Sequence, residues 1–134
     1  MRRPKLRLRW LTRQMVEAVH AGQLGEHGGS PGIRDEGLLE SALARPHHKS
    51  AYVARPDLAV LAAAYAFGLA KNHPFVDGNK RTAFMAAYVF LSLNGHDLEV
   101  AEPDIVLTME GVAAGSVAEV RLADWFRERM SVSS

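Results

Sequence analysis

The residues best suited to chemistry lie in one short stretch between two apolar segments. Nine positions hold a histidine, a carboxylate, a glycine, an amide and two cations: His73, Asp77, Gly78, Asn79, Lys80 and Arg81. Desolvating such polar groups costs free energy unless each finds a partner. Because a cluster of this kind between core helices is a poor choice for stability, the stretch indicates a functional site.

The local sequence predicts a loop that leads into a helix. Pro74 disfavours helical backbone at His73, so the preceding helix should end near Asn72. Gly78 suits a turn with positive φ, and Asn79 is a plausible N-cap for the helix that follows. The unpaired N–H groups and the dipole of a helix N-terminus favour an anion.

The side chains around this N-terminus point to a nucleotide phosphate. Arg81 can bind phosphate through two parallel hydrogen bonds, and Lys80 can meet it as a point charge. Asp77 would be repelled by phosphate unless a hard cation such as Mg²⁺ lay between them. A histidine, with an unperturbed pKa of about 6.5, can take a proton from an attacking hydroxyl at neutral pH. Together the groups describe phosphoryl or nucleotidyl transfer to a hydroxyl, and the structural alternative is a capped loop with solvated charges.

The same stretch resembles the signature of a known family. The pattern His-x-Phe-x-acidic-Gly/Ala-Asn-x-Arg of the Fic/Doc family is matched by His73, Phe75, Asp77, Gly78, Asn79 and Arg81. At roughly one chance in twenty per fixed position, six positions match at random about 10⁻⁸ times per window. The segment 33–43 also resembles the Doc branch, which extends the likeness beyond one motif.

The resemblance implies a fold and a set of roles. The fold would be all-α: a single Fic domain over residues 1–134, with a core at about 10–130. About six helices would surround a buried central pair, with a possible short N-terminal strand or flap hairpin. His73 would be the catalytic base and Asp77 the Mg²⁺ ligand, and Phe75 would anchor the loop. The ATP phosphates would be held by Gly78, Asn79, Lys80 and Arg81.

Two positions favour the Doc branch, in which the γ-phosphate of ATP is transferred. The AMP-transferring branch has Gly where this chain has Lys80, and a second Arg where it has Phe84. Gly78 departs from the best-known Doc motif, which has Ala there. The leading interpretation is therefore a protein kinase, with an AMP transferase as the alternative and an inactive binding domain as the second alternative.

The Doc branch also implies partners. Its members are toxins of toxin–antitoxin pairs that phosphorylate a threonine of elongation factor Tu and block translation. The inhibitory Ser/Thr-x-x-x-Glu-Gly/Asn motif of many Fic proteins is missing, since Val106 stands four residues before Glu110. We therefore expect a separate antitoxin, bound near the active site along the first helix and the surface around Glu36 and Glu40.

Composition is that of an ordinary globular domain. The chain has 134 residues, of which 48% are hydrophobic and 23% charged, with a net charge of +1. This balance gives no strong case for nucleic acid or membrane binding, although basic residues gather between Arg2 and Arg9. The absence of cysteine fits a cytoplasmic location, and no secretory signal is recognised. The apolar runs at 58–70 and 83–91 are shorter than a membrane-spanning helix needs to be.

The hydrophobic pattern predicts where the elements lie. Helices are expected at about 13–21, 35–44, 57–71, 79–93, 104–114 and 117–130, a short strand or extended arm at 5–11, and a frayed tail at 131–134. The segments 22–32 and 45–55 are expected to be loops, the second matching the family's target-binding flap. His20 is interpreted as structural near a helix end, and His47-His48 as part of an exposed loop rather than a metal site.

Overall fold

The computed structural model describes residues 8–52 and 57–133, which form six helices and a small two-stranded sheet. The elements, in chain order, are α1 (Arg13–His27), α2 (Glu36–Tyr52), α3 (Leu58–Asn72), α4 (Asn79–Leu93), β1 (His96–Leu98), α5 (Glu102–Ala114), α6 (Glu119–Arg129) and β2 (Met130–Val132). The predicted all-α fold of about six helices is confirmed. None of the helices in the described ranges is long and apolar enough to cross a membrane.

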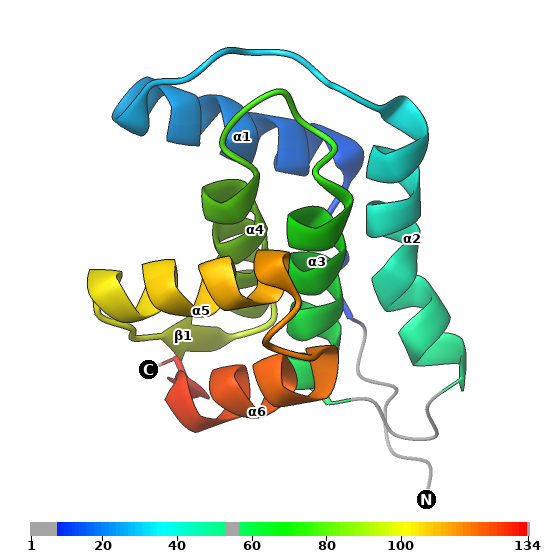
Figure 1. The fold of residues 1–134 in the computed structure, drawn as a ribbon. Helices are drawn as coiled ribbons and strands as arrows, with labels where there is room; N and C mark the ends of the chain where they lie inside the picture. The colour runs from blue at the N-terminus through cyan, green and yellow to red at the C-terminus, as the bar shows by residue number, and fades with distance from the viewer. Residues whose placement is uncertain (1–7, 53–56, 134) are drawn as a thin grey trace, which may run out of the picture.

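Helices α3 and α4 are the buried pair that the sequence predicts. They stand side by side at the centre of the molecule, with α1, α2, α5 and α6 around them (Figure 1). Alanines on α3 let the neighbouring helices approach closely. At Gly68, which has no side chain, the backbone of α2 comes into direct contact with α3. A Cβ at Gly68 would lie 3.2 Å from the Cα of Ala42 on α2. Close packing of this kind gives the loop between α3 and α4 a rigid base.

Side-chain caps start three of the helices. The Thr12 side chain accepts a hydrogen bond from the N–H of Met15 at 3.1 Å and so caps α1. Asp35 and Asp57 do the same for α2 and α3. Such caps are worth about 1 kcal/mol each, so the starts of these helices are set locally.

Helix α1 is longer than the sequence predicts. The expected loop at 22–32 was wrong over its first half, because α1 continues through Gly22 and Gly25 to His27 and ends at Gly28, where φ is 80°. Each helical glycine costs about 1 kcal/mol relative to alanine. Packing at the end of α1 offsets this cost, since Leu24 lies against the loop near Gly78.

Helix α2 also runs further than predicted. The segment 45–55 was expected to be a loop, yet α2 continues through Pro46 to Tyr52, and residues 53–56 lie outside the described part. The guanidinium of Arg45 pairs with the carboxylate of Glu119 on α6. This ion pair and the stacking of Trp10 on His47 stabilise the turn that Pro46 weakens.

The N-terminal arm packs on the body instead of forming a strand. Residues 5–7 of the predicted strand lie outside the described part, and residues 8–11 are not a strand. Trp10 stacks on His47 with ring centroids 4.0 Å apart, so His47 belongs to a helix and contacts the arm. The N–H of Leu11 donates to the buried hydroxyl of Tyr65 at 3.0 Å. Burial raises the pKa of this phenol, which stays neutral.

The sheet lies at the other terminus. Strand β2 pairs antiparallel with β1, in the register His96↔Val132. The prediction that the tail frays from Ser131 was therefore wrong through Val132, because the strand β1 supplies backbone partners that no local pattern reveals. Ser134 lies outside the described residues.

Candidate active site

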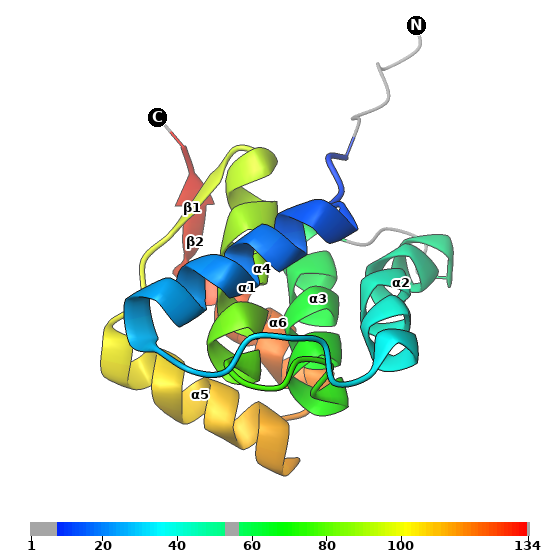
Figure 2. The ribbon, with the colours of Figure 1, turned by 90° about the horizontal axis from the view of Figure 1, so that it is seen from above.

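The loop between α3 and α4 is fastened to the segment that joins α1 to α2. The two segments run side by side in both ribbon views (Figures 1 and 2). The N–H groups of Arg34 and Asp35 donate to the carbonyl of Pro74 at 2.7 and 3.1 Å. The N–H of Val76 donates to the carbonyl of Gly32 at 3.0 Å. These backbone bonds hold the loop in one conformation.

His73 ends α3 in a conformation that few residues adopt. Its φ of 53° and ψ of 51° are left-handed, and it is the one non-glycine residue with positive φ in the described ranges. The guanidinium of Arg34 donates to the carbonyl of His73 at 2.7 Å and to that of Asn72 at 3.0 Å. The imidazole itself is exposed.

Asn79 shapes the loop from inside. Its side-chain amide accepts from the N–H of Phe75 and donates to the carbonyl of Phe75, both at 2.9 Å. Helix α4 begins at Asn79, so the predicted N-cap at this position was wrong. The cap is Gly78, whose φ of 75° suits glycine and which has no side chain over the helix N-terminus. The N–H groups of the first turn of α4 remain available for a ligand.

His20 supports the loop from α1. It is buried, stacks on Phe75 with ring centroids 3.8 Å apart, and its Nε2 lies 2.8 Å from the carbonyl of Asp77. Since a carbonyl only accepts, Nε2 carries the proton. The structural interpretation of His20 agrees with these contacts, although α1 runs seven residues beyond it to His27, so the expected position near a helix end was wrong.

Asp77 presents its carboxylate at the surface. One oxygen accepts from the N–H of Ser30 at 2.9 Å, which orients the group. Gly29 lies directly behind it, where a Cβ would be 3.3 Å from the Cβ of Asp77 and 2.9 Å from a methyl of Leu24. The glycine-rich segment therefore lets the chain approach Asp77 closely, a role that only the folded structure reveals.

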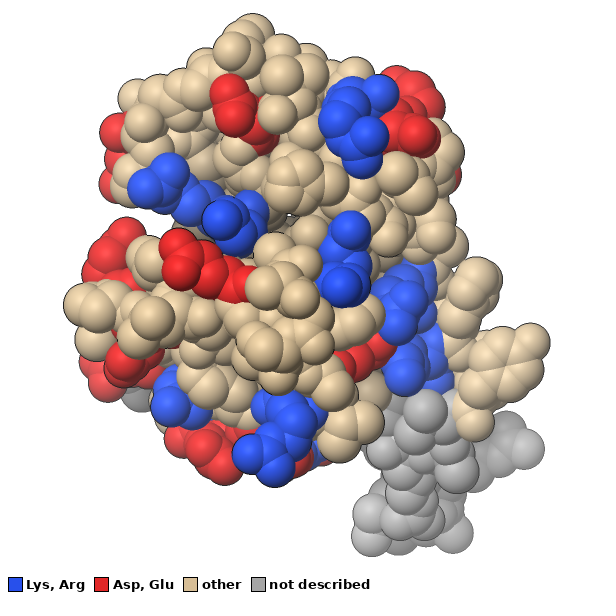
Figure 3. All heavy atoms as spheres, in the orientation of Figure 1, with Lys and Arg blue, Asp and Glu red and all other residues tan. Residues whose placement is uncertain are grey.

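A cavity of about 410 Å³ lies between this loop and α5. One wall holds the six residues that the sequence singles out: His73, Asp77, Gly78, Asn79, Lys80 and Arg81. The other wall is one face of α5, with Ile105, Val106 and Met109 between Glu102 and Glu110. Basic and acidic side chains face each other across a furrow on this side of the molecule (Figure 3).

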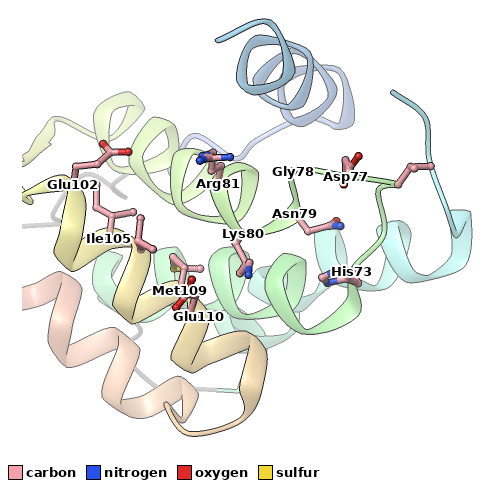
Figure 4. A pocket seen from close by; sticks show the side chains of 12 residues that line it. His73, Asp77, Gly78, Asn79, Lys80, Arg81, Glu102, Ile105, Met109 and Glu110 are labelled. Carbon is pink, nitrogen blue, oxygen red and sulfur yellow. The ribbon is translucent and has the colours of Figure 1, made fainter. Parts of the chain in front are cut away.

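The close view orders these groups along the cavity. Glu102 lies toward one end, Arg81, Lys80 and Glu110 nearer the middle, and His73 with Asp77 toward the other end (Figure 4). The volume of the cavity falls in the range of ordinary small-molecule sites. An anion would meet two cations and a helix N-terminus here, with the exposed imidazole of His73 at one end.

The sequence matches the family model described as Fic/DOC family over residues 10–91. This chain belongs to the Fic/Doc family. The match includes α1 to α3 and nearly all of α4, so it contains the whole loop and its supports. The resemblance drawn from the motif is thereby confirmed.

Two Fic/Doc relatives are similar over long stretches. One, named Protein kinase doc, from Escherichia phage P1, is 32% identical over 120 residues, which are 90% of this chain and 94% of the relative. The other, named Toxin Doc, from Mycolicibacterium smegmatis, is 51% identical over 83 residues, which are 61% of this chain and 63% of the relative. The first alignment spans almost the full length of both chains.

Sequence reasoning found the residues of this Fic/Doc loop but missed its supports. The sequence assigns no role to Arg34, and Gly29 and Ser30 are only part of the loop expected at 22–32. The bonds from Arg34 to His73 and from Ser30 to Asp77 join residues 39 and 47 positions apart. No local signal marks such contacts, because they depend on how two loops meet.

Asp77 has a carboxylate, which is the kind of oxygen ligand that Mg²⁺ prefers. Asp77 is exposed and is among the residues that line the cavity, and one of its carboxylate oxygens does not take part in the Ser30 bond. In residues 8–52 and 57–133 no three His, Cys, Asp or Glu side chains are grouped to hold a metal alone. Mg²⁺ commonly takes one or two carboxylates, with phosphate oxygens and water as its other ligands, and Asp77 could supply one such carboxylate.

Proposed function

We propose that this chain is a protein kinase of the Doc type, which uses Mg²⁺ and ATP to phosphorylate a hydroxyl of a target protein. The observation that carries the proposal is one cavity that joins His73, Asp77 and the cationic N-terminus of α4. The relative named Protein kinase doc, similar over 90% of this chain, supports the same reaction. The other relative's name supports a role as a toxin.

Each side of the cavity would serve part of the nucleotide. The phosphates would lie against the first turn of α4, held by its N–H groups and by Lys80 and Arg81. Asn79 would contribute its backbone N–H, since its amide is bound to Phe75. Asp77 would hold Mg²⁺, which neutralises phosphate charge. The apolar face of α5 around Ile105 and Met109 would contact the nucleoside.

His73 would act on the attacking hydroxyl. The hydroxyl oxygen forms a bond to the γ-phosphorus while its proton passes to the imidazole of His73. The bond between the γ-phosphorus and the bridging oxygen breaks, and ADP leaves with the electron pair. Lys80 and Arg81 stabilise the charge that builds on the phosphate oxygens during this exchange. By resemblance to the Doc branch, the hydroxyl is a threonine of elongation factor Tu.

Transfer of AMP is the second candidate, and Gly78 favours it. Against it stands Phe84, at the position where the AMP-transferring branch has a second arginine. Phe84 is 5% exposed and packs among Trp125 and Phe126, so this position contributes apolar contacts and no phosphate ligand. The second alternative, an inactive binding domain, gives no chemical reason for His73 and Asp77 to share a cavity.

The test is transfer of label from ATP. Purified protein is incubated with Mg²⁺, a bacterial lysate or purified elongation factor Tu, and ATP labelled at either the α- or the γ-phosphate. We expect label on a protein from γ-labelled ATP alone. Label from α-labelled ATP alone would replace the kinase with an AMP transferase, and no label from either would favour the binding domain.

A partner antitoxin completes the proposal. Side-chain ion pairs join the first turn of α1 to the first turns of α2, where Arg13 pairs with Glu36 and Glu40 at 2.7 and 2.6 Å. These pairs are exposed, so a disordered segment that folds on this surface could rearrange them at small cost. We propose that the antitoxin binds along α1 and the surface around Glu36 and Glu40.

We expect this chain, expressed alone in a bacterial host, to stop growth, and co-expression with the neighbouring antitoxin frame to restore it. The physical reason is that a folded segment over α1 and α2 would cover the approach to the cavity. Growth curves with and without the second frame give the measurement. Normal growth with the chain alone, together with kinase activity of the purified protein, would refute the need for a partner.

A further inference from the structure

One basic side chain outside the family motif contacts the backbone of the motif histidine directly. Arg34 spans from the α1–α2 segment to the end of α3, where its Nε donates to the carbonyl of His73 and its Nη2 to the carbonyl of Asn72. We infer that Arg34 is a positioning residue, which holds the backbone of His73 in the orientation that aims its imidazole at the cavity. This inference rests on the proposed function of His73 as the base.

The first argument is conformational. Left-handed backbone at a non-glycine residue costs of order 1–3 kcal/mol and persists where surrounding contacts determine it. The N–H of His73 donates to the carbonyl of Leu69 at 3.3 Å, which fixes one side of the residue. The bond from Arg34 to the carbonyl of His73 fixes the other side. Pro74, the next residue, has no N–H with which to add a further backbone bond.

The second argument is the fit between the two groups. The last carbonyls of a helix lack intrahelical donors and carry partial negative charge. Arg34 places a planar, permanently charged fork across two of them at 2.7 and 3.0 Å. Lysine has a compact ammonium on a flexible stem and cannot reproduce the parallel donors of a guanidinium.

The third argument is that the backbone of Arg34 is held as well. Its N–H donates to the carbonyl of Pro74 at 2.7 Å, and the adjacent Ile33 forms a bridge with Phe75. The main chain and the side chain of one residue thus contact three consecutive carbonyls, those of Asn72, His73 and Pro74. Arg34 is exposed, so these bonds add little to the core and act mainly on the loop.

The consequence is a defect in chemistry with little defect in nucleotide binding. The phosphate-binding groups belong to α4, whereas Arg34 acts on the end of α3. A base displaced by about 1 Å can cost roughly 10²-fold in rate. We expect Arg34→Ala to lower kcat about tenfold to a hundredfold and to leave the KM for ATP within about twofold.

The experiment compares Arg34→Ala and Arg34→Lys with Arg127→Ala. Arg127 is a matched control, because it also donates two hydrogen bonds from the surface, but to the carboxylates of Asp57 and Asp124. Steady-state kinetics give kcat and KM. Amide and Cα chemical shifts from NMR of the uniformly labelled protein report the backbone of His73. Thermal unfolding checks that each variant is folded.

We expect Arg34→Ala to move the His73 signals and lower kcat, Arg34→Lys to lie between it and the wild type, and Arg127→Ala to match the wild type in both. Unchanged His73 signals in Arg34→Ala would overturn the inference, as would a rise in KM with kcat unchanged. The NMR arm needs no activity. If the wild type transferred no phosphate, the proposed function would fail while the shift of His73 still tested its support by Arg34.

Discussion

Replacing His73 with alanine is expected to lower the rate of target phosphorylation by about 10²- to 10⁴-fold, the usual contribution of a positioned general base. The imidazole is exposed at one end of the cavity, so its removal costs the core little. The rate of label transfer from γ-labelled ATP gives the measurement. Growth arrest on expression of the chain should be lost in parallel.

A second substitution separates the base from the backbone. Alanine is strained at a φ of 53°, whereas asparagine tolerates left-handed backbone better than most residues. His73→Asn therefore removes the base and keeps the loop. We expect it to be as inactive as His73→Ala and at least as stable in thermal unfolding. Near-wild-type activity in His73→Asn would show that another group takes the proton.

Asp77→Asn should shift the Mg²⁺ dependence of the reaction. The amide keeps the shape of the side chain and an oxygen for the N–H of Ser30 at the 2.9 Å contact. It loses the charge that a hard cation prefers, so we expect the Mg²⁺ concentration for half-maximal activity to rise at least about tenfold. Activity should recover in part at high Mg²⁺, measured by titrating the metal at saturating ATP.

Asp104→Asn serves as the control for this change. Asp104 is an exposed carboxylate in the first turn of α5, outside the residues that line the cavity. Its removal changes the net charge by the same amount, and we expect the Mg²⁺ midpoint of the wild type. If Asp77→Asn also kept that midpoint, the metal would be bound without Asp77.

Local sequence was sufficient for the loop and the central helices because their determinants are local. Pro74 and Gly78 mark the two ends of the loop, and the apolar runs of α3 and α4 predict burial. Six residues of the motif line one cavity, and they can do so because they are close in sequence. Here propensity and tertiary packing favour the same structure.

The ends of α1 and α2 could not be predicted because local sequence preference and tertiary packing disagree there. Gly22, Gly25 and Pro46 weaken helices locally, and contacts with other elements outweigh that preference. The supports of the loop were hidden as well. His20 reaches Asp77 across 57 positions and Arg34 reaches His73 across 39. Strand β2 likewise forms only because β1 lies beside it.

The most direct test of phosphoryl transfer is the intact mass of the modified target. Purified elongation factor Tu is incubated with this chain, Mg²⁺ and unlabelled ATP, with His73→Asn as the parallel control, and its mass is measured before and after. We expect a gain equal to one phosphoryl group, with the modified residue a threonine and no gain in the control. A gain equal to one AMP would contradict it.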